Sequence, residues 1–233
     1  MDRVIGILGG MGPEATIDLY RHIVALTPAE RDQDHIRTVI VSNPKIPDRT
    51  LAILEGGEDP LPHLIEAAQI LQRAGAGILA IPCNAAHHFL RPLQLHSRIR
   101  ILSMIDETCH VFQSSFPGAR AVGVLGASGT IRSGIYRTIF GSVGVEVIVP
   151  PEEDQRRVQW CIGAVKAAKH GPATAETFES VGRALVRAGA DAVILGCTEI
   201  PLAFDQSRAG YPTLNPTRIL AQAAVDWALG RRD

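Results

Sequence analysis

Two cysteines occupy equivalent places in the sequence, each just after a short apolar run. Cys83 follows AGILAIP, and Cys197 follows DAVILG. The next residue is polar in both cases, Asn84 and Thr198, and could cap a helix or turn. A thiol near a helix N-terminus has a lowered pKa, so part of it is the reactive thiolate. Two opposed thiols without metal-ligand spacing indicate a base and an acid on the two faces of one carbon, which is the chemistry of a racemase.

The alternative for these cysteines is a packing role, because free cysteine is among the most buried residue types. That interpretation suits Cys109 and Cys161, which lie inside helical patterns. It suits the first pair less well, because both of its members follow predicted strands at the carboxyl edge, where α/β sheets bind ligands. The four cysteines are scattered and no C-x-x-C occurs, so we expect free thiols and no metal site.

A glycine-rich turn is the second candidate for a binding site. In ILGGMGPEAT, Gly10, Gly12 and Ala15 fit the dinucleotide fingerprint, whose backbone amides hold a pyrophosphate at a helix N-terminus. That fingerprint also needs an acidic residue at the end of the second strand. The corresponding segment, RTVIVSNPKIP, has none. We therefore favour a structural turn or a site for a small carboxylate over NAD.

Short β-branched runs alternate with longer helical patterns, which is typical of parallel strands covered by helices. The predicted fold class is therefore α/β. We predict strands at residues 3–8, 37–42, 76–81, 98–102, 120–125, 145–149 and 191–196. We predict helices at residues 14–26, 60–74, 103–115, 176–189 and 215–229.

The chain also repeats itself. RVIGILGGMGPEAT near the start resembles RAVGVLGASGTIRS in the second half, and RAGAGILAIPCNAA resembles RAGADAVILGCTEI. Two matches in the same order and at nearly the same spacing indicate a duplicated unit. In the second copy, Ser128 and Thr130 mirror the first glycine turn, and their hydroxyls could hold a carboxylate or cap a helix.

The duplication predicts two similar three-layer α/β lobes with mainly parallel sheets, related by a pseudo-twofold axis. We expect the first lobe to comprise residues 1–100 together with the C-terminal helix 215–230. The second lobe would comprise residues 101–214. The active site would lie in the cleft between the lobes, where Cys83 and Cys197 approach it from opposite sides.

Composition narrows the function further. The chain has 233 residues, 46% of them hydrophobic, which is ample for a core. Its 23 basic and 24 acidic side chains are interspersed and give a net charge of −1, so neither nucleic acid nor a membrane surface is an expected partner. The apolar run at the N-terminus is too short for a signal peptide and no run is long enough for a membrane span, so we expect a cytoplasmic protein.

The stretches IGILGGMGPEAT, NPKIPDRT, PCNAAH and LGCTEIPL resemble the pyridoxal-phosphate-independent aspartate/glutamate racemase family, and most of all its aspartate racemase branch. The resemblance covers essentially the whole chain. It implies a racemase without cofactor or metal, commonly a homodimer, in which Cys83 and Cys197 are the catalytic thiols. It also implies a set of residues near the substrate: Met11, Arg49, Asn84, Ala85 and Lys166.

The substrate expected from this resemblance is a small amino acid or dicarboxylate, because Arg49 and Lys166 are suited to carboxylates. Related glutamate racemases carry a His after the second Cys-Thr, where this chain has Glu199, so aspartate is favoured over glutamate. Thr198 and Glu199 are included among the substrate-binding residues. Ala85 replaces the family's usual Thr and removes a hydroxyl that could hold the substrate carboxylate.

Two other functions stay open at this stage. The same cysteine positions would serve an isomerase or decarboxylase of a small carboxylic acid on the same fold. A non-catalytic protein that binds a small acid would keep Arg49 and Lys166 without the chemistry. Two intact cysteines argue against the second of these.

Overall fold

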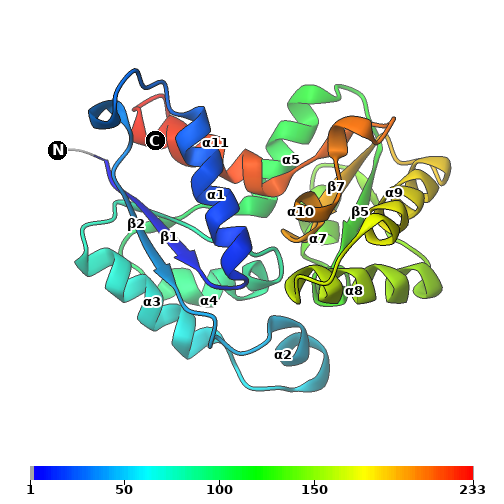
Figure 1. The fold of residues 1–233 in the computed structure, drawn as a ribbon, viewed down its shortest axis with the longest axis horizontal. Helices are drawn as coiled ribbons and strands as arrows, with labels where there is room; N and C mark the ends of the chain where they lie inside the picture. Colours follow the sequence, from blue (N-terminus) through cyan, green and yellow to red (C-terminus); the bar gives the residue numbers. More distant parts are fainter. Residues whose placement is uncertain (1–2, 233) are drawn as a thin grey trace.

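The computed structural model describes residues 3–232 and contains two four-stranded parallel sheets, one in each of two lobes (Figure 1). The first sheet is formed by β1 (Ile5–Gly9), β2 (Thr38–Ser42), β3 (Ile78–Ala80) and β4 (Arg100–Ile101). The second is formed by β5 (Ala121–Gly126), β6 (Glu146–Ile148), β7 (Ala192–Gly196) and β8 (Thr213–Leu214). Every strand pair is parallel, so the predicted α/β fold class is confirmed.

Helices surround both sheets. Those up to the end of the first sheet are α1 (Pro13–Leu26), η1 (Asp32–Asp34), α2 (Arg49–Glu55), α3 (Leu61–Arg73), η2 (Ala85–Phe89) and α4 (Leu90–Leu95). The remainder are α5 (Met104–Ser115), α6 (Ser128–Ser133), α7 (Ile135–Gly141), α8 (Glu152–Lys166), α9 (Pro172–Arg187), α10 (Ile200–Ala203), η3 (Gln206–Arg208) and α11 (Pro216–Ala228). No helix of the described residues has the length and apolar character to cross a membrane.

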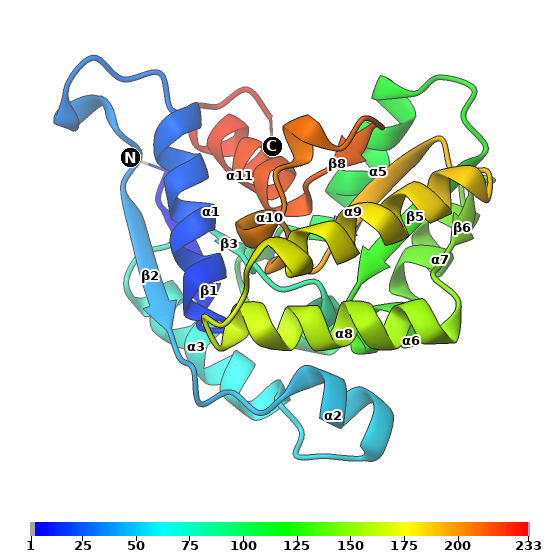
Figure 2. The ribbon, with the colours of Figure 1, turned by 45° about the vertical axis from the view of Figure 1, so that its right-hand side comes forward.

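The first sheet buries both of its faces. Ile5 and Ile7 of β1 pack in a core with α1 and α11, whereas Leu8 packs in the core on the side of α3. This alternation follows from the two-residue period of a strand. Figure 2 shows α11, the last helix of the chain, beside α1, the first, and the two make extensive contact. The first lobe is therefore a three-layer arrangement with the C-terminal helix on it.

The second sheet is built in the same way. Val193 and Leu195 of β7 pack against α8 and α9, and Val122 and Val124 of β5 pack against α5 and α7. Its strand order, β6-β5-β7-β8, repeats the order β2-β1-β3-β4 of the first sheet. This agreement supports the duplicated unit that the sequence predicts. The exact division of the chain near residue 100 stays a prediction, because α5 also packs against α11.

The shared strand order determines where a site can form. In a sheet of order 2-1-3-4, the chain passes from strand 1 to one edge of the sheet and from strand 3 to the other edge. Ligands bind at the carboxyl ends of these two neighbouring middle strands. In the first sheet these are β1 and β3, which lead to Met11 and Cys83; in the second they are β5 and β7, which lead to Ala127 and Cys197. Both cysteines thus follow the third strand of their own sheet.

Helix α2 links the two lobes. It projects from the first lobe below the second (Figure 1) and contacts α6, at the start of which lies Gly129. A Cβ atom at Gly129 would lie 2.7 Å from the hydroxyl oxygen and 2.9 Å from the Cα of Thr50. Only glycine lets the two helices approach this closely.

Candidate active site

A small cavity between the lobes brings both predicted thiols together. We call it the thiol cavity; its volume is about 20 Å³, room for roughly one water molecule. Cys83 and Cys197 line it, and each is 7% exposed. The full lining comprises Met11, Asp48, Arg49, Thr50, Cys83, Asn84, Ala85, Ala127, Thr130, Lys166, Cys197, Thr198 and Glu199. Each lobe therefore contributes one thiol to a nearly closed site.

A buried histidine, His87, hydrogen-bonds to the backbone of Cys83. The Nδ1 atom of His87 lies 2.9 Å from the carbonyl oxygen of Cys83, and Nε2 accepts a hydrogen bond of 3.0 Å from the amide of Met104. Because Nε2 accepts, Nδ1 carries the proton and donates it to the carbonyl. Burial lowers the pKa of His87 and keeps the ring neutral. His87 thus fixes the loop after β3 and does not reach the cavity, and His88 does not line it either.

Cys197 has a carboxylate partner. Its Sγ donates a hydrogen bond of 2.9 Å to Oε2 of Glu199, and the Thr198 hydroxyl donates to the same oxygen at 3.3 Å. Burial, followed by the negative charge of Glu199, raises the pKa of Cys197 well above its ordinary value, while Lys166 opposes the shift. In this arrangement Cys197 is a protonated thiol.

Three buried polar atoms of the cavity lining have no hydrogen-bond partner: Arg49 Nε, Asn84 Nδ2 and the hydroxyl oxygen of Thr130. An unpaired buried donor costs about 1 to 3 kcal/mol, so each such group needs an explanation, and a bound ligand is one. Two of the three are N–H donors and the third is a hydroxyl. Together they form a set of hydrogen-bond donors suited to a carboxylate.

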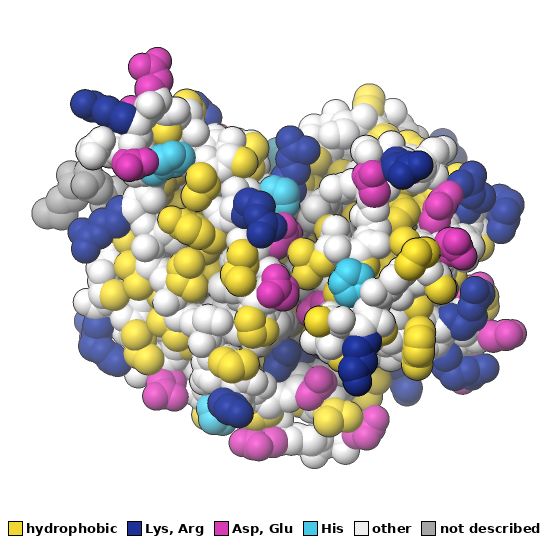
Figure 3. Space-filling view, viewed as in Figure 1, with side chains coloured by type: hydrophobic (Ala, Val, Ile, Leu, Met, Phe, Trp, Pro, Cys, Tyr) yellow, Lys and Arg dark blue, Asp and Glu magenta, His cyan; other side chains and the backbone are white. Residues whose placement is uncertain are grey.

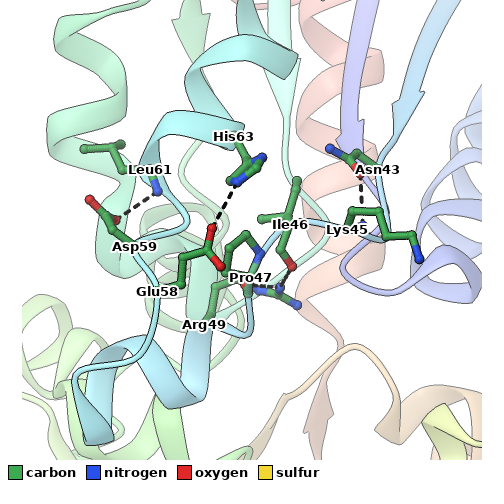
Figure 4. A network of polar contacts seen from close by, with 9 residues as sticks. All are labelled: Asn43, Lys45, Ile46, Pro47, Arg49, Glu58, Asp59, Leu61 and His63. Atoms are coloured by element: carbon green, nitrogen blue, oxygen red, sulfur yellow. Dashed lines mark hydrogen bonds and ion pairs between the residues drawn. The ribbon is translucent and has the colours of Figure 1, made fainter.

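Arg49 is positioned by its own loop. Its Nη1 donates hydrogen bonds of 2.9 Å to the carbonyl of Ile46 and 2.6 Å to that of Pro47 (Figure 4). The side chain of Asp48 accepts from the amides of Thr50 and Leu51 and so caps α2. These contacts occupy one end of the guanidinium and leave Nε unpaired. The NPKIPDRT stretch is therefore a loop that presents an arginine.

Lys166 supplies a second cation. It is the last residue of α8 and lines the thiol cavity. Burial lowers its pKa, but the groups that carry or can carry negative charge nearby, Cys197, Glu199, Cys83 and Asp48, outweigh this effect and raise it. Lys166 is therefore a permanent positive charge at neutral pH.

A wider space adjoins the thiol cavity. We call it the outer cavity; its volume is about 230 Å³, and it shares Met11, Arg49, Lys166 and Glu199 with the thiol cavity. Its remaining walls are mainly apolar or glycine: Gly10, Gly12, Pro13, Glu14, Pro44, Val165 and Leu202. Figure 3 shows acidic and basic side chains along the junction of the lobes on the face seen in Figure 1.

The structure brings the predicted site residues together, with one exception. Ser128 does not line the thiol cavity; its amide donates to Gln159 Oε1 at 2.8 Å, and its hydroxyl accepts from Gln155 at 3.3 Å. The prediction missed Asp48, Thr50 and Ala127. Asp48 and Thr50 flank Arg49 in the NPKIPDRT stretch. Their position next to a predicted site residue was the sequence feature that could have identified them.

The first glycine turn has a structural role. The amide of Gly10 donates to the Thr16 hydroxyl at 2.9 Å, and this hydroxyl donates in turn to the carbonyl of Gly12 at 3.1 Å. Gly10 has a φ of +95°, and a Cβ there would lie 2.4 Å from the backbone of Asn43. The turn thus packs tightly and presents Met11 to the cavity. Within residues 3–232 no group of three or more His, Cys, Asp or Glu side chains could hold a metal ion.

Known proteins match this chain over nearly its full length. A family model described as Asp/Glu/Hydantoin racemase matches residues 8–224. The broad specificity amino-acid racemase RacX of Bacillus subtilis is 28% identical over 228 residues, which are 95% of this chain and 96% of that protein.

Solved structures agree. An aspartate racemase from Picrophilus torridus superposes with a TM-score of 0.85 at 31% identity, covering 97% of this chain and 94% of that one. A glutamate racemase from Francisella tularensis, in complex with D-glutamate, shares the fold at 15% identity with a TM-score of 0.72, over 99% and 82% of the two chains. The chain therefore belongs to the Asp/Glu/Hydantoin racemase family and is an amino-acid racemase.

Proposed function

We propose that the protein racemises aspartate or a closely related acidic amino acid, and that Cys83 and Cys197 are the two proton-transfer groups. The observation that carries this proposal is the thiol cavity, in which both sulfurs and three unpartnered polar groups meet. One thiolate removes the α-hydrogen, and the opposite thiol delivers a proton to the other face of the carbon. The reverse reaction exchanges the two roles.

The unpartnered groups are assigned to the α-carboxylate. The α-hydrogen of an amino acid is only weakly acidic, so the site must stabilise negative charge that spreads onto the carboxylate as the hydrogen leaves. Arg49 Nε, Asn84 Nδ2 and the Thr130 hydroxyl are buried and have no other hydrogen-bond partner, so they are available to stabilise this charge. No bound cofactor is required for this scheme.

An acidic side chain on the substrate is supported by charge and space. Arg49 and Lys166 line both cavities, so a substrate whose α-carbon lies between the sulfurs would direct its side chain along these cations into the outer cavity. The similarity of this chain to the aspartate racemase of Picrophilus torridus supports aspartate as the substrate. The volume of the outer cavity and the broad specificity of RacX support tolerance of larger side chains.

The test is exchange of the α-hydrogen in D₂O, followed by ¹H NMR over a panel of D- and L-amino acids. We expect loss of the α-proton signal together with appearance of the other enantiomer, fastest for aspartate. Decarboxylation or isomerisation of a small acid without racemisation would instead identify the alternative chemistry. Absence of any exchange, with binding retained, would identify a binding protein.

We further propose a homodimer in the cytoplasm. The resemblance to the racemase family supports the dimer. Sedimentation equilibrium of the purified chain tests it, and a single species with the monomer mass of 25.0 kDa would contradict it.

A further inference from the structure

Glu199 makes the two halves of the site chemically different. The duplicated segments align Cys83-Asn84-Ala85 with Cys197-Thr198-Glu199, so the position of Glu199 is occupied by Ala85 in the first lobe. Both side chains line the thiol cavity. Within the described residues, only the second thiol therefore has a carboxylate in hydrogen-bond contact.

The contact has the geometry of a proton transfer. The sulfur of Cys197 and Oε2 of Glu199 are 2.9 Å apart, and both residues are buried, with Glu199 only 4% exposed. The Thr198 hydroxyl donates to the same oxygen and orients the carboxylate. Asp48, the other carboxylate of the lining, is occupied by the amides at the start of α2. Glu199 is thus the carboxylate available to this thiol.

The proton of Cys197 must move before this thiol can act as a base. The thiolate is the basic form, and a buried thiol beside a carboxylate favours the protonated form. Cys197 is only 7% exposed, and Oε2 of Glu199 lies 2.9 Å from its sulfur, so this carboxylate is an acceptor in direct contact with the thiol. The proton can therefore move within the site.

We propose that Glu199 accepts the proton of Cys197 when that thiol acts as the base, a role that rests on the proposed two-thiol racemase function. The S–H bond of Cys197 breaks, its electron pair stays on sulfur, and an O–H bond forms at Oε2, so the charge of the pair remains −1. The thiolate then takes the α-hydrogen of one enantiomer while the Cys83 thiol protonates the opposite face. In the reverse direction Cys83 begins as the thiolate, Cys197 as the thiol, and the proton stays on Glu199.

The test is Glu199→Gln, which keeps the shape and a hydrogen-bond acceptor but cannot take the proton. We expect kcat to fall by a factor of about 10² to 10⁴, the range for loss of general acid–base assistance, with little change in KM. Because D- and L-substrate have equal free energies, kcat/KM must fall equally in both directions. Glu199→Asp should retain part of the activity, and Glu153→Gln, at an exposed carboxylate of α8, should be unchanged.

A second readout does not depend on turnover. In a Cys83→Ser background, alkylation of Cys197 by iodoacetamide is followed as a function of pH by peptide mass spectrometry. Removing the charge of Glu199 should move this profile to lower pH, so the thiol becomes more reactive at neutral pH although the enzyme becomes slower.

Three outcomes would overturn the proposal: retained kcat in Glu199→Gln, a raised KM with kcat unchanged, or an alkylation profile that does not move. The second would mean that Glu199 binds the substrate ammonium group. A shifted profile in a protein that racemises no amino acid would refute the proposed function and still support proton sharing between Glu199 and Cys197. Thermal unfolding of each variant controls for loss of fold.

Discussion

The hydroxyl group of Tyr136, in the second lobe, donates a hydrogen bond of 2.6 Å to Oδ1 of Asn84, in the first lobe. Both side chains are 2% exposed. Burial raises the pKa of Tyr136, so the hydroxyl stays protonated and always donates. Since Oδ1 is occupied, the unpartnered Nδ2 is the part of Asn84 that remains for the proposed contact with a substrate. The second lobe thus orients an amide that belongs to the first.

Tyr136→Phe tests this relationship. The substitution leaves Oδ1 of Asn84 buried and unpaired, which costs about 1 to 3 kcal/mol of unfolding free energy. The amide is then free to rotate, and we expect kcat/KM to fall about tenfold, equivalent to roughly 1.4 kcal/mol. Urea unfolding and steady-state kinetics measure the two effects. Tyr211→Phe is the control, because its hydroxyl donates a hydrogen bond of 3.3 Å to the backbone carbonyl of Glu179 and does not line the thiol cavity. Equal losses of activity in both variants would contradict the assignment.

The two thiols should have opposite stereochemical preferences. Cys83→Ser and Cys197→Ser each leave one thiol, which can remove the α-hydrogen only from the enantiomer that presents it. We expect net racemisation to collapse in both, while residual exchange in D₂O persists on D-substrate in one variant and on L-substrate in the other. The same preference in both variants, or near-normal racemisation in either, would end the two-thiol mechanism.

Arg49 should discriminate between acidic and neutral substrates. Loss of a buried partner of a carboxylate costs about 2 to 5 kcal/mol, so Arg49→Ala should lower kcat/KM by roughly 30-fold to several thousand-fold for aspartate. Alanine, which lacks the side-chain carboxylate, would lose only the proposed contact of Arg49 Nε with the α-carboxylate and should lose less. Arg156→Ala, at an exposed arginine of α8 paired with Glu152, is the control. An equal loss for aspartate and alanine would contradict a contact between Arg49 and the side-chain carboxylate.

His87 gives the fold a pH dependence. Its pKa is lowered in the folded protein, so below about pH 6.5 the unfolded chain binds a proton that the folded chain does not. The unfolding free energy should therefore decrease as the pH falls from 7 to 5, with a slope of at most about 1.4 kcal/mol per pH unit from this group. Urea titrations of wild type and His87→Gln at several pH values isolate the effect. A difference between the two proteins that is constant with pH would contradict it.

Gly129 should control the distance between α2 and α6. Gly129→Ala places a Cβ too close to the backbone of Thr50, so α2 must move away. Arg49, the first residue of α2, would move with it. We expect KM for aspartate to rise. Gly163→Ala is the matched control, because a Cβ there meets nothing within 4 Å, and alanine is favoured over glycine in a helix by about 0.5 to 1 kcal/mol. An unchanged KM in Gly129→Ala would show that the contact does not position Arg49.

Local sequence patterns were sufficient for most of the fold. Each of the seven predicted strands overlaps an observed one, because short apolar and β-branched runs are recognisable without tertiary information. The strand β8 was missed, since its two residues, Thr213 and Leu214, are too few to show an alternation of apolar and polar side chains. The helices α2, α6 and α7 are only six or seven residues long and lie between glycines and prolines, so their patterns are too short to read.

The site was predictable where it follows strand ends and unpredictable where it depends on the packing of distant segments. The duplication predicted that Cys83 and Cys197 approach one cavity, because both copies place a cysteine just after a core strand, and the structure has both in the thiol cavity. At Ser128 the symmetry left a carboxylate site and a cap both open, and two glutamines of α8 contact its amide and hydroxyl. Nothing near Tyr136 in the sequence indicates that it reaches Asn84, 52 residues away.

The small volume of the thiol cavity bears on the isotopic outcome of the proposed two-thiol reaction. With room for about one water molecule, few solvent molecules compete for a hydrogen that a thiolate has taken from the substrate. Reversal before exchange with solvent returns the original atom to the same carbon, whereas exchange replaces it with deuterium in D₂O. Under the proposed mechanism, the deuterium content of recovered substrate, compared with that of product, therefore measures how often the thiol exchanges with solvent for each proton that crosses the site.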